Sequence, residues 1–406
     1  MFRKLIIIAS MIVILAFTGC SAVNEQKPSK ENTQRPEKTV DPIREQIKKM
    51  TLEDKIGQMV IAGFEGYTVD GNTRTLIEDY HIGGFILFGR NVDSPDQLLN
   101  LINSLKDTNS GSKVPLFVSV DEEGGRVSRM PSQLVKLPSN KTIGKAGSNI
   151  SYKIGKVLAE ETASFGFNMD FAPVLDINSN PQNPVIGDRA FGSDEKIVTR
   201  LGVETMKGIR AGGVIPVVKH FPGHGDTSVD SHVGLPSVVD DMDRLKRFEL
   251  VPFNDAIRNG ADAVMVAHIL LTRIDPGYPA SLSKTIITDL LRKQLNFNGV
   301  VLTDDMTMGA IVKNYSIGSA AVRSVNAGSD IVLVCHGYDN ELTVINSLKK
   351  AVEDGSIKEN RVDESVYRIL KLKQKYRLSD SPVASIDINK INSHISAVLD
   401  AGLQAK

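Results

Sequence analysis

Short apolar runs alternate with longer amphipathic stretches along the chain from about residue 41 onward. Each run ends abruptly in polar or glycine residues, a pattern typical of strands buried in a parallel sheet. Eight such runs occur, at residues 57–63, 83–88, 115–120, 168–175, 215–219, 263–267, 299–303 and 330–335. We therefore predict eight parallel strands, each followed by a helical connection.

The stretches between the runs carry apolar residues three or four positions apart, which indicates helices that cover a sheet. They lie at residues 95–107, 151–166, 197–211, 245–259, 285–296 and 318–327. Eight strand–helix units in this order predict an α/β fold, a (β/α)8 TIM barrel, as a single catalytic domain over residues 41–378. No G-x-G-x-x-G motif opens a helix, which argues against a doubly wound dinucleotide-binding sheet. The C-terminal tail, residues 379–406, contains an amphipathic stretch at 388–399 that is long enough for a packing helix.

Ionisable residues follow six of the predicted strands. They are Asp121, Asp176, His220, His268, Asp304 and His336. In a (β/α)8 barrel the C-terminal ends of the strands form the face that carries the active site. We expect these side chains to gather around one barrel mouth.

The loop at residues 219–236, KHFPGHGDTSVDSHVGLP, is the densest group of ionisable residues in the chain. Its prolines and glycines exclude a regular helix or strand, so we expect a loop shaped for function. A purely structural loop, and a zinc site formed by His220, His224 and His232, are the two alternatives. We favour acid/base and substrate-binding roles, and predict no metal.

The segment VVLTDDMTM, residues 300–308, delivers two consecutive carboxylates to the barrel mouth. Side chains alternate along a strand, so Asp304 and Asp305 cannot both point to the same centre. We expect one carboxylate to act and the other to brace the following turn. A carboxylate opposite a proton donor is the minimal machinery for cleaving a glycosidic bond.

A third motif, VSVDEEGGRVSR at residues 118–129, combines a strand end with a glycine turn and two arginines. Together with NPVIGDRAFG at 183–192, it predicts a polar clamp for a small ligand that bears hydroxyl groups. We expect Asp121 and Arg129 to belong to this clamp. For Glu122 and Glu123, surface ion pairs are an alternative interpretation.

Several segments, taken in order, resemble the glycoside hydrolase family 3 β-N-acetylglucosaminidases. They are VDEEGGRVSR, MDFAPVLDIN, GDRAFGSD, KHFPGHGDTSVDSH and the stretch that ends in TDDMTM. The resemblance implies a retaining exo-β-N-acetylglucosaminidase that forms a covalent glycosyl-enzyme intermediate and needs no cofactor. It also implies a substrate from peptidoglycan, such as GlcNAc–MurNAc muropeptides.

The family's functional residues fall on definite positions of this chain. The resemblance makes Asp304 the nucleophile and His232 the general acid/base, with Asp230 orienting His232. The sugar's hydroxyl and acetamido groups would be bound by Asp121, Arg129, Arg189, Lys219 and His220. An imidazole suits the acid/base role at neutral pH because its ordinary pKa is near 6.5.

The N-terminus has the layout of a bacterial export signal. Arg3 and Lys4 precede an uncharged run at residues 5–17 that is too short to span a bilayer comfortably. The run ends in FTGC, which resembles a lipobox, so we expect residues 1–20 to be a lipoprotein signal peptide and Cys20 to be lipidated. Residues 21–40 are polar and predict a flexible linker. The enzyme would then sit on the extracytoplasmic face of the cell membrane, held by a lipid anchor.

Composition narrows the possible partners. Lys+Arg and Asp+Glu both total 48, so the chain lacks the basic excess of a nucleic-acid binder. It has no Trp, which favours a small polar pocket over a long polysaccharide cleft lined with aromatic rings.

We expect a monomer. The alternatives are another family 3 β-glycosidase such as a β-glucosidase, a phosphorylase, a zinc-dependent hydrolase, and a sugar-binding lipoprotein with two lobes and a hinge.

Overall fold

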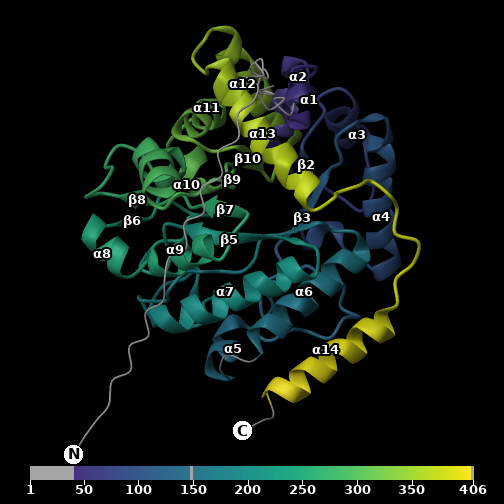
Figure 1. Cartoon of the computed structure of the whole chain (residues 1–406), viewed down its shortest axis with the longest axis vertical. Coiled ribbons are helices and arrows are strands. Elements are labelled where there is room, and N and C mark those ends of the chain that lie inside the picture. The colour runs from purple at the N-terminus through teal and green to yellow at the C-terminus, as the bar shows by residue number, and fades with distance from the viewer. Residues whose placement is uncertain (1–40, 147–149, 404–406) are drawn as a thin grey trace, which may run out of the picture. The chain divides into compact units, whose positions relative to one another are not determined.

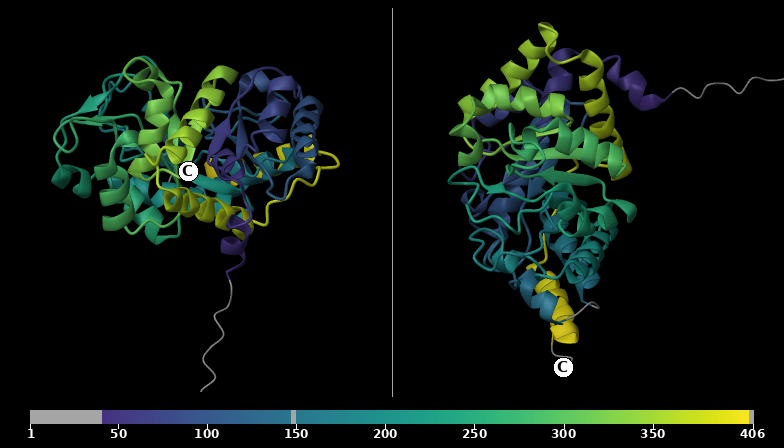
Figure 2. Two further views of the ribbon diagram at one scale, coloured as in Figure 1. Left: turned by 90° about the horizontal axis from the view of Figure 1, so that it is seen from above. Right: turned by 90° about the vertical axis from the view of Figure 1, so that its left-hand side faces the viewer.

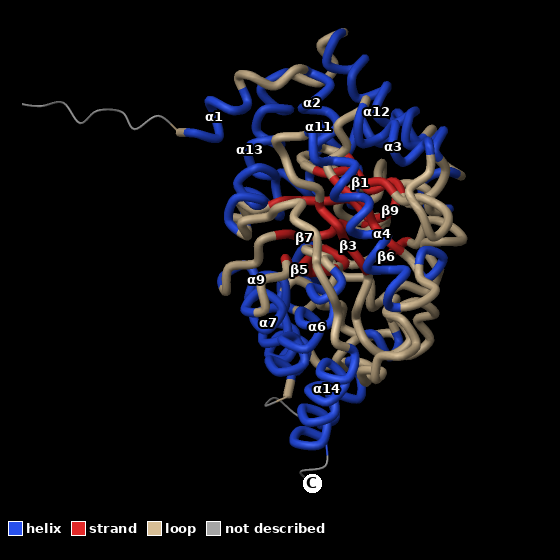
Figure 3. Tube along the Cα trace, turned by 90° about the vertical axis from the view of Figure 1, so that its right-hand side faces the viewer, coloured by secondary structure: helices blue, strands red, loops and turns tan. Residues whose placement is uncertain are grey.

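The computed structural model describes residues 41–146 and 150–403. The predicted signal peptide, Cys20 and the linker at 21–40 lie outside the described residues. Eight parallel strands form a closed barrel in the order β1-β10-β9-β7-β5-β4-β3-β2 (Figures 1 and 3). Their bounds are β1 Val60–Ala62, β2 Gly84–Leu87, β3 Phe117–Val120, β4 Met169–Asp170, β5 Ile215–Phe221, β7 Ala263–Val266, β9 Val300–Asp305 and β10 Ile331–Val334. The predicted (β/α)8 barrel is confirmed.

Each strand lies within a predicted apolar run or overlaps it, but three strands end two or more residues from the predicted position. One is β9, which continues past Thr303 to Asp305. The fourth strand was predicted over 168–175, yet β4 ends at Asp170. Pro173 has no N–H to donate to a neighbouring strand, and beyond β4 only a single bridge joins Val174 to Lys219. The fifth strand instead extends to Phe221, so β5 carries Lys219 and His220 within its last three residues.

Helices surround the strands, as the blue and red tubes of Figure 3 show. Their bounds are α1 Pro42–Ile47, α2 Leu52–Gln58, α3 Gly71–Glu78, α4 Pro95–Thr108, α5 Asn140–Ala146, α6 Ser151–Phe165, α7 Glu195–Ala211, α8 Met242–Arg247, α9 Val251–Arg258, α10 Gly309–Val312, α11 Ile317–Ala327, α12 Tyr338–Glu353, α13 Glu359–Lys375 and α14 Ile388–Leu403. A π-helix spans Thr285–Gln294, and short 3-10 turns lie at Gly89–Asn91, Asn109–Gly111, Gly187–Arg189 and Ala280–Leu282. Outside the barrel, β6 Ser237–Val238 pairs with β8 Leu270–Leu271.

The prediction of one helix over 245–259 was wrong. The helical backbone ends at Phe248, whose φ is −138°, and α9 begins three residues later. Pro252 lies in the first turn of α9, where its missing N–H leaves no hydrogen bond unmade. The same proline inside a continuous helix would remove a hydrogen bond and collide with the preceding turn.

The C-terminal tail returns to the barrel wall. α14 packs against α6, and its Ile391, Ile395 and Val398 are buried (yellow in Figures 1 and 2). The Asn392 side chain accepts a hydrogen bond from the Val135 N–H at 2.8 Å and donates one to the Gln133 carbonyl at 2.8 Å. This helix therefore fastens the long loop that follows β3. Within the described ranges, no helix combines the length and apolar character needed to cross a membrane.

Candidate active site

A cavity of about 360 Å³ lies at the C-terminal ends of the barrel strands. Every residue predicted from the sequence to act or to bind substrate lines it: Asp121, Arg129, Arg189, Lys219, His220, Asp230, His232 and Asp304. The barrel thus brings together side chains from the C-terminal ends of four strands, β3, β4, β5 and β9, and from the loops after them. Of the other strand-end residues, His336 also lines the cavity, whereas Asp176 and His268 are fully buried and support their neighbours.

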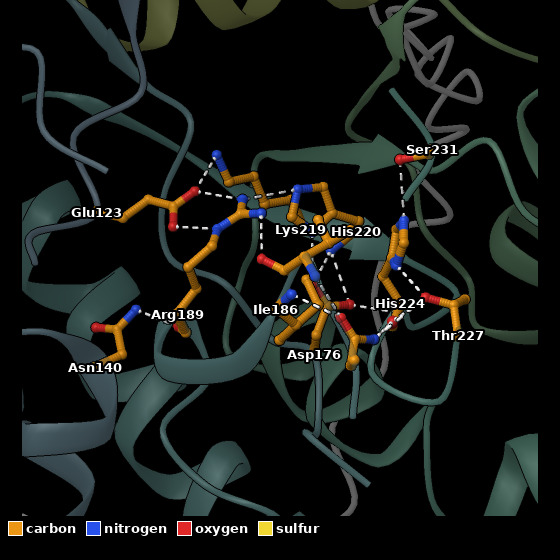
Figure 4. Close-up of polar contacts among 12 residues, drawn as sticks. Glu123, Asn140, Asp176, Ile186, Arg189, Lys219, His220, His224, Thr227 and Ser231 are labelled. Atoms are coloured by element: carbon orange, nitrogen blue, oxygen red, sulfur yellow. Dashed lines mark hydrogen bonds and ion pairs between the residues drawn. The ribbon is translucent and has the colours of Figure 1, made fainter. Parts of the chain in front are cut away.

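Paired charges form one wall of the cavity. Lys219 Nζ lies 2.5 Å from Asp121 Oδ1 and 2.7 Å from Glu123 Oε1. Arg189 donates two hydrogen bonds to the same Glu123 carboxylate, at 2.7 and 2.8 Å. Figure 4 shows the Glu123 carboxylate facing both cations, with dashed lines that mark its contacts to each. Burial acts to raise the pKa of Glu123, but Arg189 and Lys219 outweigh it and hold this pKa far below its ordinary value.

Glu123 is a site residue that the sequence analysis missed, since surface ion pairs were an open interpretation for Glu122 and Glu123. That interpretation is wrong, because the two residues are only 1% and 3% exposed. Gly124 and Gly125, with φ of +78° and +61°, form the turn that begins directly after Glu123. Glycine adopts such angles without strain, so this turn was the available signal that the segment folds back into the barrel mouth.

Glu122 points away from the cations into an acidic neighbourhood. Its Oε2 accepts a hydrogen bond from the Arg129 N–H at 2.8 Å, and its own N–H donates to Asp170 Oδ1 at 3.0 Å. Burial raises the pKa of Glu122 to about 7. Burial, together with the charge of Glu122, also raises the pKa of Glu161 well above its ordinary value. Two adjacent glutamates therefore favour opposite protonation states.

Asp176 supports the loop that follows β5. Its carboxylate lies 2.6 Å from His220 Nδ1 and accepts the His224 N–H at 2.6 Å. On the other side of the His220 ring, Arg189 lies 3.3 Å from Nε2 (Figure 4). A guanidinium can only donate, so Arg189 donates to His220 Nε2, and the Asp176 carboxylate accepts a hydrogen bond from Nδ1–H. The two contacts hold the His220 ring in one orientation.

The three histidines of this loop are held by different partners rather than by one centre. The His224 ring contacts the Thr227 hydroxyl at 2.8 Å and the Ser231 hydroxyl at 3.2 Å, and burial lowers the pKa of His224 to about 4. His232 pairs with Asp230. Within residues 41–146 and 150–403, no group of three or more His, Cys, Asp and Glu side chains is arranged to hold a metal ion.

Asp304 and Asp305 occupy different environments at the end of β9. The Asp305 carboxylate accepts hydrogen bonds from the Thr307 N–H, the Thr307 hydroxyl and the Cys335 N–H, at 2.9, 2.5 and 2.9 Å. It thus braces two loops. The hydrogen bond to Asp304 comes from the Asp305 N–H at 2.9 Å, which leaves lone pairs of Asp304 directed to the cavity. Burial acts to raise the pKa of Asp304, but the imidazoles of His268 and His220 hold it below its ordinary value.

His232 is the most exposed of the candidate catalytic side chains, at 67%, and Asp230 is 37% exposed. His232 Nδ1 lies 2.8 Å from Asp230 Oδ1, and the same oxygen accepts the His232 N–H at 2.9 Å. This contact leaves Nε2 open to the cavity. The Gly309 N–H donates to the His232 carbonyl at 3.2 Å, and the Ala310 N–H to the Ser231 carbonyl at 3.0 Å. The loop is thereby attached to the segment that follows Asp304.

Comparison with known proteins agrees with this geometry. Residues 51–372 match the family model described as "Glycosyl hydrolase family 3 N terminal domain". The chain belongs to glycosyl hydrolase family 3. The resemblance inferred from the sequence motifs is confirmed.

Relatives within family 3 carry names that refer to hexosamine sugars. The chain is 37% identical over 376 residues to Beta-hexosaminidase A of Pseudoalteromonas piscicida, covering 82% of this chain and 63% of that protein. It is 34% identical over 323 residues to Beta-hexosaminidase of Nitrosomonas eutropha, covering 77% and 91%. A glycoside hydrolase family 3 beta-N-acetylglucosaminidase from Paenibacillus superposes with a TM-score of 0.81 at 41% identity, covering 87% and 69%. The chain thus spans less than two thirds of the Pseudoalteromonas protein.

The contrast between the two glutamates gives a testable prediction. At about pH 6, Glu123→Gln should lower the free energy of unfolding by about 3 kcal/mol, because it leaves Lys219 and Arg189 without their shared counter-charge. Glu122→Gln should not lower it and should raise it slightly, because glutamine has the shape of the neutral acid that folded Glu122 favours and needs no proton uptake on folding. Urea denaturation of both variants measures the difference. Equal losses would contradict the assigned protonation states.

Proposed function

We propose that the protein is a retaining exo-β-N-acetylglucosaminidase that removes terminal GlcNAc from peptidoglycan fragments. One observation carries the proposal: the unbraced carboxylate of Asp304 and the exposed imidazole of His232 line one small cavity. The names of the family 3 relatives support an N-acetylhexosamine as the sugar.

In the first step, an oxygen of Asp304 attacks the anomeric carbon while the bond to the leaving oxygen breaks. His232 Nε2–H gives its proton to that oxygen, so the leaving group departs as a neutral alcohol. Asp230 holds the other ring nitrogen and thereby orients the ring, as the third member of a hydrolase triad does. The depressed pKa of Asp304 keeps the nucleophile ionised at neutral pH.

In the second step, water attacks the anomeric carbon of the glycosyl-enzyme and displaces Asp304. His232 takes the proton of that water and returns to its starting state. Each of the two displacements inverts the anomeric centre, so the overall reaction retains configuration. The wall formed by Lys219, Glu123 and Arg189 supplies fixed charges and hydrogen bonds for a single sugar ring. A cavity of this size suits removal of one terminal residue at a time.

The nucleophile assignment predicts different outcomes for adjacent substitutions. Asp304→Asn should give a folded, sugar-binding protein that has lost catalysis, because the amide cannot form the glycosyl ester. Asp305→Asn should keep substantial activity, because its remaining oxygen can still accept hydrogen bonds from the Thr307 and Cys335 N–H groups. A 2-fluoro glycoside inactivator, followed by peptide mass analysis, identifies the labelled residue. Labelling of Asp305, or of any other residue, would overturn the assignment.

The acid/base assignment predicts a dependence on the leaving group. His232→Ala should lose roughly 10²–10⁴-fold on substrates with poor sugar leaving groups. With a good aryl leaving group the first step should suffer much less, and added azide should restore turnover by attacking the intermediate. Asp230→Ala should act in the same direction but more weakly, because Asp230 only orients and tunes the ring.

Steady-state rates on a disaccharide and on an aryl glycoside, with and without azide, measure this dependence. Equal losses on both substrates with no glycosyl azide formed would contradict acid/base catalysis by His232. That pattern, joined to sensitivity to chelators, would instead favour a metal-binding histidine.

We also propose that Cys20 carries a lipid anchor that holds the enzyme on the extracytoplasmic face of the cell membrane. The support is the FTGC ending of the export signal, followed by a polar stretch that would keep the barrel clear of the lipid. Cys20→Ser should release the enzyme from membranes or leave its precursor unprocessed, with catalysis intact. Cell fractionation and the mass of the N-terminal peptide measure both outcomes. A correctly cleaved variant that stays on the membrane would count against lipidation.

A further inference from the structure

A group of rings lines the same cavity at strand ends that carry none of the residues assigned above. Phe88 directly follows β2, and His336 follows β10 by two residues. These two strands flank β1 on either side. The rings of Phe88 and His336 are stacked, with centroids 5.6 Å apart and planes inclined at 29°. We call Phe88, Arg90 and His336 the ring ledge.

Arg90 fixes the ledge in place. Its Nε donates to the Phe64 carbonyl at 3.0 Å, and a terminal nitrogen donates to the Cys335 carbonyl at 2.7 Å. Its guanidinium lies over the Phe88 ring, 4.5 Å from the centroid, and pairs with Glu65 at 2.9 Å. One side chain thus ties together the loops after β1, β2 and β10. The two rings are held in position before any ligand binds, which reduces the entropy lost on binding.

The ledge lies apart from the two cations of the charged wall, whereas Asp121 follows β3, the strand that pairs with β2. Lys219 and Arg189 belong to β5 and to the loop after β4, which lie across the barrel from β1. The loop of His232 is instead bonded to residues just after β9, and β9 pairs directly with β10. The His232 loop is thus attached beside a strand that neighbours β10, after which His336 lies.

The ledge has the surface chemistry of a sugar platform. The His336 side chain is 52% exposed, so part of its ring is accessible to a ligand. A pyranose ring presents aliphatic C–H groups on its faces, and these pack well against a flat aromatic ring. The chain contains no Trp, and the ledge has only the two smaller rings of Phe88 and His336. An aromatic surface of this size suits one further sugar rather than a long saccharide.

We propose that the ring ledge binds the leaving-group sugar, with one face of that sugar packed against the exposed His336 ring, which the stacked Phe88 ring supports. The inference rests on the proposed glycosidase function and assigns the second sugar of the substrate to residues that recognise it. It makes the ledge a determinant of substrate preference, separate from the groups that carry out bond cleavage.

The test compares two substrates that share GlcNAc and differ in the leaving group. One is a β-1,4-linked GlcNAc disaccharide, and the other is N-acetyl-β-glucosaminyl fluoride, whose leaving group has no ring. His336→Ala should lower kcat/KM for the disaccharide about three- to tenfold, the usual worth of a ring contact, and should change the fluoride rate by less than about twofold. The inhibition constant of free GlcNAc should stay the same, because GlcNAc fills the charged part of the cavity.

Two further variants test this result, one that should reproduce the effect and one that serves as a control. Phe88→Leu keeps apolar bulk but removes the flat ring, so it should shift the substrate ratio in the same direction. Tyr152→Ala removes an exposed ring that does not line the cavity and should leave the ratio unchanged. An equal loss on both substrates, or no loss on the disaccharide, would overturn the ledge alone. If the wild-type protein cleaved neither substrate, the proposed function itself would fail.

Discussion

The geometry of the cavity depends on one buried carboxylate, Glu123, shared by Lys219 and Arg189. Two cations cannot lie close together in a largely dehydrated site without a counter-charge, and Glu123 supplies it. Arg189 in turn contacts Nε2 of His220, while the Asp176 carboxylate accepts a hydrogen bond from Nδ1 on the other side of that ring. From β3 to β5, the polar side chains of the mouth thus form a chain of contacts in which each partner limits the orientation of the next.

The environment of each group decides what it can do chemically. Buried and bonded on both ring nitrogens, His224 has its pKa lowered to about 4 and serves as a neutral structural group. His232, exposed and held at one nitrogen by Asp230, has a free ring nitrogen and fits proton transfer. The same contrast separates the two aspartates of β9, because the Asp305 carboxylate accepts three hydrogen bonds whereas that of Asp304 accepts one.

The pattern of apolar runs was sufficient to predict the barrel, because parallel buried strands and their polar ends are encoded locally. The predicted site residues gather at one mouth because the fold itself brings strand ends together. The break in the helix predicted over 245–259 could have been found from Pro252, a residue that disfavours the interior of a helix. Glu123 could not have been recognised with certainty, because consecutive glutamates beside arginines are equally typical of a solvated surface. The stacking of Phe88 on His336 joins residues far apart in the chain, and no local spacing indicates it.

The proposed mechanism is a double displacement in which Asp304 forms a covalent bond to the sugar. The stereochemistry of the released sugar tests that claim most directly. A proton NMR time course during rapid cleavage of a β-linked GlcNAc substrate follows the anomeric signal of free GlcNAc before mutarotation mixes the two forms. A double displacement predicts that the signal of the β anomer appears first and that the signal of the α anomer increases only later, through mutarotation. Release of the α anomer as the first product would mean a single displacement by water, and would contradict a nucleophilic role for Asp304.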